Sequence, residues 1–213
     1  ENPENRFKVT TKFNSKKKSL EESLFSSLKL LNLKKIDTIL FHSYDDYLLN
    51  KNNLNLFTSL NKFKYFEKIG VSIYTNDELK SCLEDENIEV IQTPFNLLDN
   101  DSKKGKLLKK AKKLDKEIQV RSVFLQGLFF RPDSFFDNHF VEIGSKLKVL
   151  KELATQSNYN LNELALKYVL SKQYIDSIII GFDNIEQLEK NLVSFNQNID
   201  TKVEKIIDKI NIN

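Results

Sequence analysis

The chain has 213 residues, of which 40% are hydrophobic and 30% charged, with a net charge of +3. This length suits one or two domains, and the hydrophobic content excludes a wholly disordered chain. So small a net charge gives no general argument for nucleic-acid binding. The single cysteine, Cys82, excludes an intrachain disulfide and suits the cytoplasm. No apolar run approaches the roughly 18 residues of a membrane span.

Six short apolar runs predict strands, and each run carries a polar residue or glycine at or just beyond its C-terminal end. In chain order we expect strands at Phe7–Thr11, in the first half of Lys35–Tyr44, and at Ile69–Ile73, Val90–Thr93, Gln119–Phe124 and Ile178–Ile180. The second run is followed at once by His42, Ser43 and Tyr44. This profile is typical of buried parallel strands that open into a polar site at their carboxyl ends.

Helical patterns lie between these runs, and several begin with the polar pair of a capping box, for example Ser19 with Glu22 and Thr75 with Glu78. The expected helices run from Ser19 to near Asn32, Asn53–Lys64, Thr75 to about Leu83, Lys103–Asp115, Val141–Ser157, Asn160–Lys172, Asn184 to about Phe195, and Lys202–Ile212. Steady alternation of strand and helix predicts an α/β fold with a parallel sheet. A doubly wound sheet and a β/α barrel both fit. The dinucleotide fingerprint G-x-G-x-x-G is missing, and a barrel of eight strands and about 250 residues would need two more units.

Lys12 and His42 follow successive predicted strands. Either residue alone is more often a solvated or hydrogen-bonded structural side chain. Their matching positions favour a shared site that could hold a carbonyl oxygen or shift a neighbour's pKa. Ser72, Gln92 and Ser122 stand at equivalent strand ends and could hydrogen-bond a ligand that bridges the strands.

Two further features leave alternatives open. Gly181 and Asn184 open a helix whose N-terminus could bind a phosphate, or Asn184 could simply cap it. The lysine-rich run Lys103–Lys113 could contact nucleic acid or acidic lipid, but such a run is more often the solvated face of a packed helix. The second histidine, His139, is interpreted as incidental.

Six segments, in this order along nearly the whole chain, resemble the aldo/keto reductase family: VTTKF, SLKLLNLKKIDTILFHS, KIGVSIY, IQTPFN, RSVFLQG and IIIGFDNIEQLEKNL. The resemblance implies a (β/α)8 barrel fold whose first two βα units are absent from this chain, so that residues 1–213 form a single barrel domain from the third strand to the C-terminus. It also implies an oxidoreductase that reduces the carbonyl of a small-molecule aldehyde or ketone with NADP(H), or possibly NAD(H). It places the first strand of this chain at the family's third.

The resemblance also implies roles for individual residues. Lys12 and His42 correspond to the catalytic lysine and histidine. The residues that would bind the cofactor are Ser72 and Gln92 at the carboxamide, Arg121 against the nicotinamide, Ser122, Phe124, Gln126 and Gly127 at the pyrophosphate, and Gly181, Asp183, Gln187 and Asn191 at the adenosine phosphate end. No metal site is implied.

The sequence departs from the family pattern in three ways. Ile73 replaces an asparagine that commonly helps to bind the carboxamide, and Gln187 replaces an arginine that often binds the 2′-phosphate. The family's catalytic aspartate and tyrosine would precede Glu1, so we expect them on a segment outside this sequence. The alternative hypothesis is a catalytically incomplete relative that serves as a nucleotide-binding regulatory or scaffold protein.

Nucleic-acid binding through Lys103–Lys113 is a third hypothesis, and the leading hypothesis includes no nucleic-acid or membrane partner. Substrate specificity is expected from two variable loops, Tyr44–Asn53 and Phe129–Phe140. The identity of the substrate and the oligomeric state are not predicted.

Overall fold

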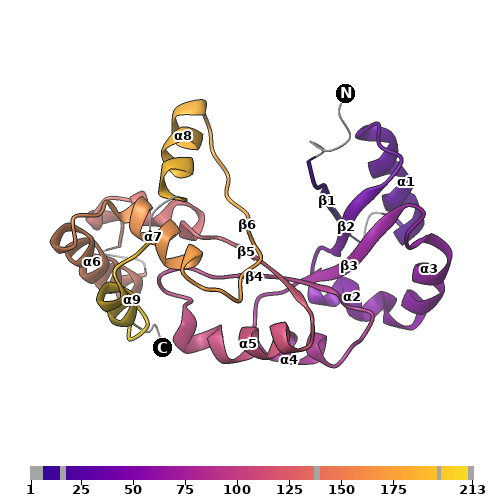
Figure 1. The fold of residues 1–213 in the computed structure, drawn as a ribbon, viewed down its shortest axis with the longest axis horizontal. Coiled ribbons are helices and arrows are strands. Elements are labelled where there is room, and N and C mark those ends of the chain that lie inside the picture. The colour runs from indigo at the N-terminus through magenta and orange to yellow at the C-terminus, as the bar shows by residue number, and fades with distance from the viewer. Residues whose placement is uncertain (1–6, 15–17, 137–139, 196–197, 211–213) are drawn as a thin grey trace. The chain divides into compact units, whose positions relative to one another are not determined.

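The computed structural model describes residues 7–14, 18–136, 140–195 and 198–210, so His139 lies outside the described residues. Strands and helices alternate along the chain (Figure 1). The strands are β1 (Thr10–Phe13), β2 (Ile36–Phe41), β3 (Phe66–Ser72), β4 (Val90–Pro94), β5 (Glu117–Arg121) and β6 (Ser177–Ile178). The α-helices are α1 (Leu20–Leu30), α2 (Tyr44–Asn50), α3 (Leu54–Asn61), α4 (Asn76–Leu83), α5 (Lys106–Lys113), α6 (Val141–Gln156), α7 (Leu161–Leu170), α8 (Ile185–Ser194) and α9 (Thr201–Ile207).

The sheet follows chain order from β1 to β6, and its described pairings are parallel. This confirms the predicted α/β class. A doubly wound sheet reverses its strand order at a switch point, whereas the strands of a β/α barrel follow the chain. The observed order therefore favours the barrel-type arrangement over the doubly wound one. None of the helices in the described ranges combines the length and the apolar composition needed to cross a bilayer.

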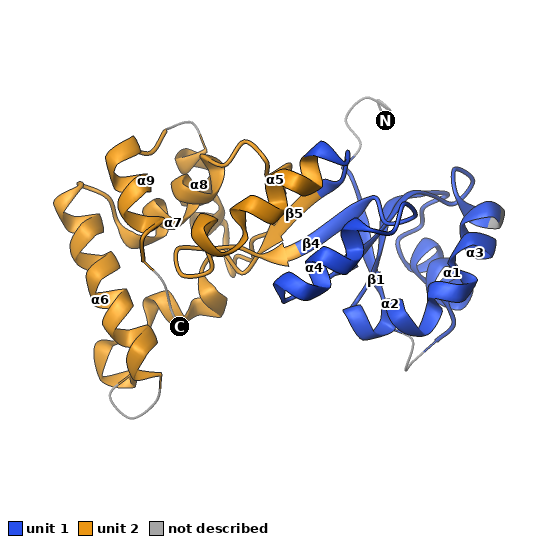
Figure 2. Ribbon diagram, turned by 90° about the horizontal axis from the view of Figure 1, so that it is seen from below, with its two compact units in different colours: residues 1–92, 113–117 blue, residues 93–112, 118–213 orange. Residues whose placement is uncertain are grey.

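The chain divides into two compact units, coloured separately in Figure 2. Unit 1 comprises residues 1–92 and 113–117, and unit 2 comprises residues 93–112 and 118–213. Unit 1 holds the first three strands and the start of β4, whereas unit 2 holds most of β5, all of β6 and the last four helices. Each unit has its own buried core.

In unit 1, helix α1 packs one leucine face into the core. Leu20, Leu24 and Leu28 are buried, and the predicted capping box of Ser19 and Glu22 is confirmed by two reciprocal hydrogen bonds of 2.9 and 3.2 Å. Leu31, the C-cap residue that follows the last helical residue Leu30, is exposed. Spacing of four residues along a helix thus defines the face that covers the sheet.

In unit 2, the core is built around aromatic rings. Phe95 and Tyr168 stack with ring centroids 5.8 Å apart, and both side chains are fully buried. The side-chain amide of Asn100 donates hydrogen bonds to the carbonyls of Ile207 and Ile210 at 2.9 and 2.8 Å. These bonds fix the C-terminal end of α9 to the loop that follows β4.

Several predicted boundaries were wrong. Strand β5 ends at Arg121 rather than Phe124 because the next residue, Ser122, has a φ of +60°, which extended strands do not adopt. The basic run begins as a π-helix, Asp101–Gly105, before α5 starts. Most of the predicted loop Tyr44–Asn53 is helical, and the hydroxyl of Ser43 caps α2 by accepting from the backbone N–H of Asp46.

Candidate functional site

In unit 1, the strand register relates four predicted site residues at or just beyond the carboxyl ends of neighbouring strands. Lys12 pairs with Leu40, Leu40 with Gly70, and Gly70 with Val90. His42, Ser72 and Gln92 follow those last three residues by two positions each. Because side chains of a strand alternate between the two faces, Lys12, Ser72 and Gln92 stand on the same face near the carboxyl ends. His42 lies one residue beyond the end of β2.

Two polar side chains of this set are in contact. The ammonium of Lys12 donates to the hydroxyl of Ser72 at 3.2 Å. Ser72 pairs in register with Gln92, and both are buried, whereas Lys12 and His42 are exposed. Gly70 permits the close approach of β3 and β4, since a Cβ there would clash with the carbonyl oxygen of Val90. Within unit 1, Lys12 and Ser72 are therefore in contact, and Gln92 pairs with Ser72 in register.

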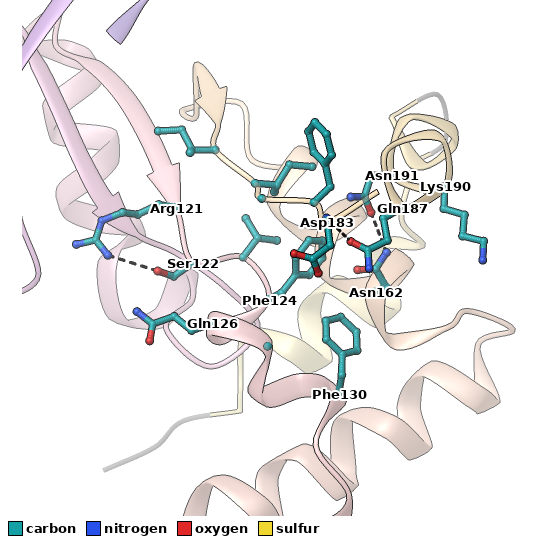
Figure 3. A pocket seen from close by; sticks show the side chains of 16 residues that line it. Arg121, Ser122, Phe124, Gln126, Phe130, Asn162, Asp183, Gln187, Lys190 and Asn191 are labelled. Carbon is teal, nitrogen blue, oxygen red and sulfur yellow. Dashed lines mark hydrogen bonds between the residues drawn. The ribbon is translucent and has the colours of Figure 1, made fainter. Parts of the chain in front are cut away.

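Unit 2 contains a cavity of about 770 Å³, a size typical of ligand pockets. All nine residues predicted to bind the remainder of the cofactor line it, namely Arg121, Ser122, Phe124, Gln126, Gly127, Gly181, Asp183, Gln187 and Asn191. Arg121 and Ser122 lie at one end, and the polar side chains of Asp183, Gln187, Asn191 and Asn162 lie at the other (Figure 3). Aromatic rings, including Phe124 and Phe130, supply apolar wall between them.

The first wall of the pocket is the segment that follows β5. Ser122, Leu125, Gln126 and Gly127 all have positive φ angles, of 60°, 48°, 54° and 82°. Two successive turns close the segment, because the N–H of Leu125 donates to the carbonyl of Ser122 and the N–H of Gly127 to that of Phe124. Left-handed backbone is unfavourable for residues other than glycine, so contacts outside the segment must stabilise this conformation.

The opposite wall is the N-terminal end of α8. The side-chain oxygen of Asn184 accepts from the N–H of Gln187, and the Gln187 side chain accepts from the N–H of Asp183, both at 2.9 Å. This confirms the predicted cap at Asn184. Asn191 is buried and accepts a 2.9 Å hydrogen bond from the Asn162 amide. The pocket therefore presents carbonyl, amide and carboxylate groups at this end.

The cations of the pocket differ in their surroundings. The Arg121 guanidinium donates to the Ser122 hydroxyl at 3.4 Å. The Lys190 ammonium pairs with Glu186 at 2.7 Å on the exposed surface of α8. Lys104 does not line the pocket. Burial lowers the pKa of its ammonium, although a 2.5 Å ion pair with Asp99 opposes that shift.

In the described residues, no three His, Cys, Asp or Glu side chains are grouped to hold a metal ion.

The sequence reasoning missed part of the lining: Val123, Phe130, Asn162, Ile179, Ile180, Phe182 and Lys190. Five of these are apolar, and apolar residues carry no signal that distinguishes a pocket wall from a core. Lys190 lies in the same motif as Gln187 and Asn191, three residues beyond Gln187, so helical spacing could have suggested it. Asn162 is brought to the pocket by the packing of α7 against α8, which no local pattern reveals.

A family model described as "Aldo/keto reductase family" matches residues 1–212. The fold is similar to that of the aldo-keto reductase AKR11C1 from Bacillus halodurans. The apo form of that enzyme has a TM-score of 0.77 and 22% sequence identity, and the match covers 94% of this chain and 70% of that one. The holo form has a TM-score of 0.79 and 20% sequence identity, and the match covers 98% of this chain and 73% of that one. The glycerol dehydrogenase AKR11B4 from Gluconobacter oxydans has a TM-score of 0.73 at 17% identity, over 95% and 71%. No curated protein matches the chain. These solved structures show that the chain shares their fold.

Proposed function

The chain belongs to the aldo/keto reductase family, and we propose that it binds NADP(H) or NAD(H) and takes part in reducing an aldehyde or ketone to an alcohol. The observation that supports this most strongly is that nine residues from two distant motifs line one cavity. The sequence resemblance assigned all nine to the cofactor. Their gathering around one cavity supports a dinucleotide as the ligand.

The pocket has the chemistry that this ligand requires. Arg121 offers a planar cation that can stack on a nicotinamide ring or bind phosphate. The segment Ser122–Gly127 and the α8 end would hold the pyrophosphate and the adenosine end. The aromatic side chains give the apolar surface on which flat rings pack.

In unit 1, we assign Ser72 and Gln92 to the carboxamide, and Lys12 and His42 to the reacting carbonyl. When bound, the nicotinamide supplies the hydride. His42 is exposed at a strand end and could donate a hydrogen bond that orients the carbonyl oxygen. The Lys12 ammonium, held by Ser72, would stabilise negative charge that develops on that oxygen. None of the 213 residues is assigned as the proton donor.

The preference between the two nicotinamide cofactors also belongs to the proposal. Gln187 offers no positive charge at the adenosine end of the pocket. This feature favours NAD(H). We further propose that the substrate is a small carbonyl compound and that the protein acts in the cytoplasm, where the free and buried Cys82 needs no partner.

Titration of the purified chain with NADPH and NADH, followed by fluorescence and calorimetry, tests the proposal. We expect saturable binding of at least one cofactor with a Kd below about 1 mM, the upper end of common substrate affinities. Mixing the complex with a panel of aldehydes and ketones then tests for loss of NAD(P)H absorbance. Binding without turnover would favour the nucleotide-binding relative, and absence of binding would contradict the proposed function.

A further inference from the structure

Asn96 is a buried residue of the loop that follows β4 and does not itself line the cavity. Its side-chain oxygen accepts hydrogen bonds from the N–H groups of Leu98 and Asp99, at 2.9 and 3.0 Å. Because these two donors fix which side of the amide is oxygen, the NH₂ group must point the other way. There it donates to the carbonyl of Ser122 at 3.2 Å.

The Ser122 carbonyl belongs to the first residue of Ser122–Gly127, the segment that forms one wall of the pocket. It also accepts the N–H of Leu125 at 2.9 Å, which closes the first of the two turns. One residue earlier, the N–H of Phe95 donates to the carbonyl of Arg121 at 3.1 Å. The loop after β4 thus holds the segment after β5 at two consecutive carbonyls, one through backbone and one through the Asn96 side chain.

The conformation held in this way is unfavourable by itself. Ser122, Leu125 and Gln126 are non-glycine residues in left-handed backbone, within a stretch of five residues. Residues 122–124, 126 and 127 all line the cavity. A side chain that anchors the start of this segment from outside the pocket therefore affects the position of one entire wall.

We propose that Asn96 is a positioning residue for the dinucleotide pocket: its amide holds Ser122 in left-handed conformation and so preorganises the wall Ser122–Gly127. This inference rests on the proposed function for the identity of the ligand. Its physical content, the anchoring of the segment, does not depend on the ligand. Preorganisation raises affinity because the free protein has already lost the entropy of ordering the wall.

The substitution that tests it is Asn96→Asp. A carboxylate keeps the acceptor for Leu98 and Asp99 but removes the NH₂ group that donates to the Ser122 carbonyl. The matched control is Asn100→Asp in the same loop. Asn100 is also fully buried, and its NH₂ group also donates to carbonyls, but those belong to Leu97 and to Ile207 and Ile210 near α9. Asn100 does not line the cavity.

Both variants should lower the melting temperature. We expect Asn96→Asp to raise the Kd for NADPH or NADH about fivefold to tenfold, the effect of losing one hydrogen bond, and Asn100→Asp to change it less than about twofold. We also expect faster amide hydrogen exchange in residues 122–127 of the Asn96 variant, and normal exchange there in the Asn100 variant.

The exchange measurement decides the inference even if the wild-type chain binds neither cofactor, a result that would contradict the proposed function alone. Unchanged exchange in residues 122–127 of the Asn96 variant would overturn the inference. It would also be overturned if the wild-type chain binds cofactor and both variants lose affinity equally, because Asn96 would then contribute only to general stability.

Discussion

The ammonium of Lys12 in β1 donates a hydrogen bond to the hydroxyl of Ser72 at the end of β3, over 3.2 Å. Strand β2 lies between these two strands in the sheet. Neighbouring strands are about 4.8 Å apart, so a contact that joins β1 to β3 must bridge roughly 10 Å between the two backbones. The long Lys12 side chain, the hydrogen bond and the Ser72 side chain bridge this distance together. The ammonium is therefore held above the carboxyl end of β2, the strand that His42 follows.

Replacement of Lys12 by methionine should remove this positive charge and keep most of the side-chain volume. In any preparation of the protein that turns over, we expect the rate of carbonyl reduction to fall about 10²-fold or more, the range typical of a lost catalytic group. The measurement is steady-state kinetics with a fixed aldehyde. Lys8→Met is the control, since Lys8 is exposed and precedes the same strand. Undiminished turnover in the Lys12 variant would refute the assignment.

Much of the fold could be predicted from local sequence. The capping residues Ser19, Thr75, Asn160 and Asn184 all accept the expected hydrogen bond from the third helical residue, because this bond needs only neighbours in the chain. The order of strands and helices followed from apolar periodicity. The end of β5 could not be predicted, because the φ of Ser122 is stabilised by Asn96, which lies 26 positions away.

The residues of the candidate site were also predicted only in part from the sequence. Motifs predicted residues at both ends of the cavity, from Arg121 to Asn191, since polar residues at strand ends and helix starts stand out in sequence. The apolar residues of the wall, such as Phe130 and Ile179, could not be predicted from the sequence. Asn162 also escaped prediction because its place in the lining arises from packing between α7 and α8. Tertiary contacts decide these positions, and a single sequence records them only indirectly.

A negative charge at position 187 should weaken the binding of NADPH more than the binding of NADH. In Gln187→Glu, a carboxylate can still accept from the N–H of Asp183 and adds an anion to the first turn of α8, which should stabilise the helix by about 0.3–1 kcal/mol. If the 2′-phosphate binds at this end, its repulsion should raise the Kd for NADPH about fivefold more than the Kd for NADH.

Two titrations, one per cofactor, measure this ratio, and a urea titration measures the stability. Gln173→Glu makes the same change of net charge at an exposed position outside the cavity and should leave both affinities unaltered. Equal weakening of NADPH and NADH by the Gln187 variant would show that the 2′-phosphate does not lie beside this residue.

Loss of the Tyr168 hydroxyl should destabilise unit 2. This hydroxyl donates to Asp208 at 2.5 Å and accepts from the N–H of Asp101 at 3.0 Å, and burial together with the bond to Asp208 raises its pKa. Tyr168→Phe leaves both partners short of a hydrogen bond, at a cost of about 1–3 kcal/mol in the free energy of unfolding.

Urea unfolding followed by circular dichroism measures this cost. Tyr159→Phe is a suitable control, because Tyr159 is only half-buried and the Lys167 ammonium over its ring would remain, 4.7 Å from the centroid. We expect the control to change the free energy of unfolding by less than about 0.5 kcal/mol. Equal effects of the two substitutions would mean that the Tyr168 hydroxyl contributes nothing specific.

Acid should weaken unit 2 partly through Asp101. Burial of this carboxylate opposes its ionisation, but hydrogen bonds from the Tyr174 hydroxyl at 2.7 Å and the Lys109 ammonium at 3.2 Å outweigh burial and lower its pKa. A carboxyl with a lower pKa in the folded state contributes stability that is complete above its unfolded pKa. That stability is lost as the pH falls towards the folded pKa, because the unfolded chain binds the proton first.

Asp101→Asn should therefore lower the free energy of unfolding at neutral pH by about 1–3 kcal/mol, since Tyr174 and Lys109 lose their anionic acceptor. The difference between wild type and variant should shrink as the pH is lowered below about 4, where the wild-type chain loses the same contribution. Urea titrations at several pH values between neutrality and acid measure this difference directly. Asp45→Asn, at an exposed position of α2, controls for the loss of one negative charge. A difference that stays constant across the acid range would mean that ionisation of Asp101 is not linked to folding.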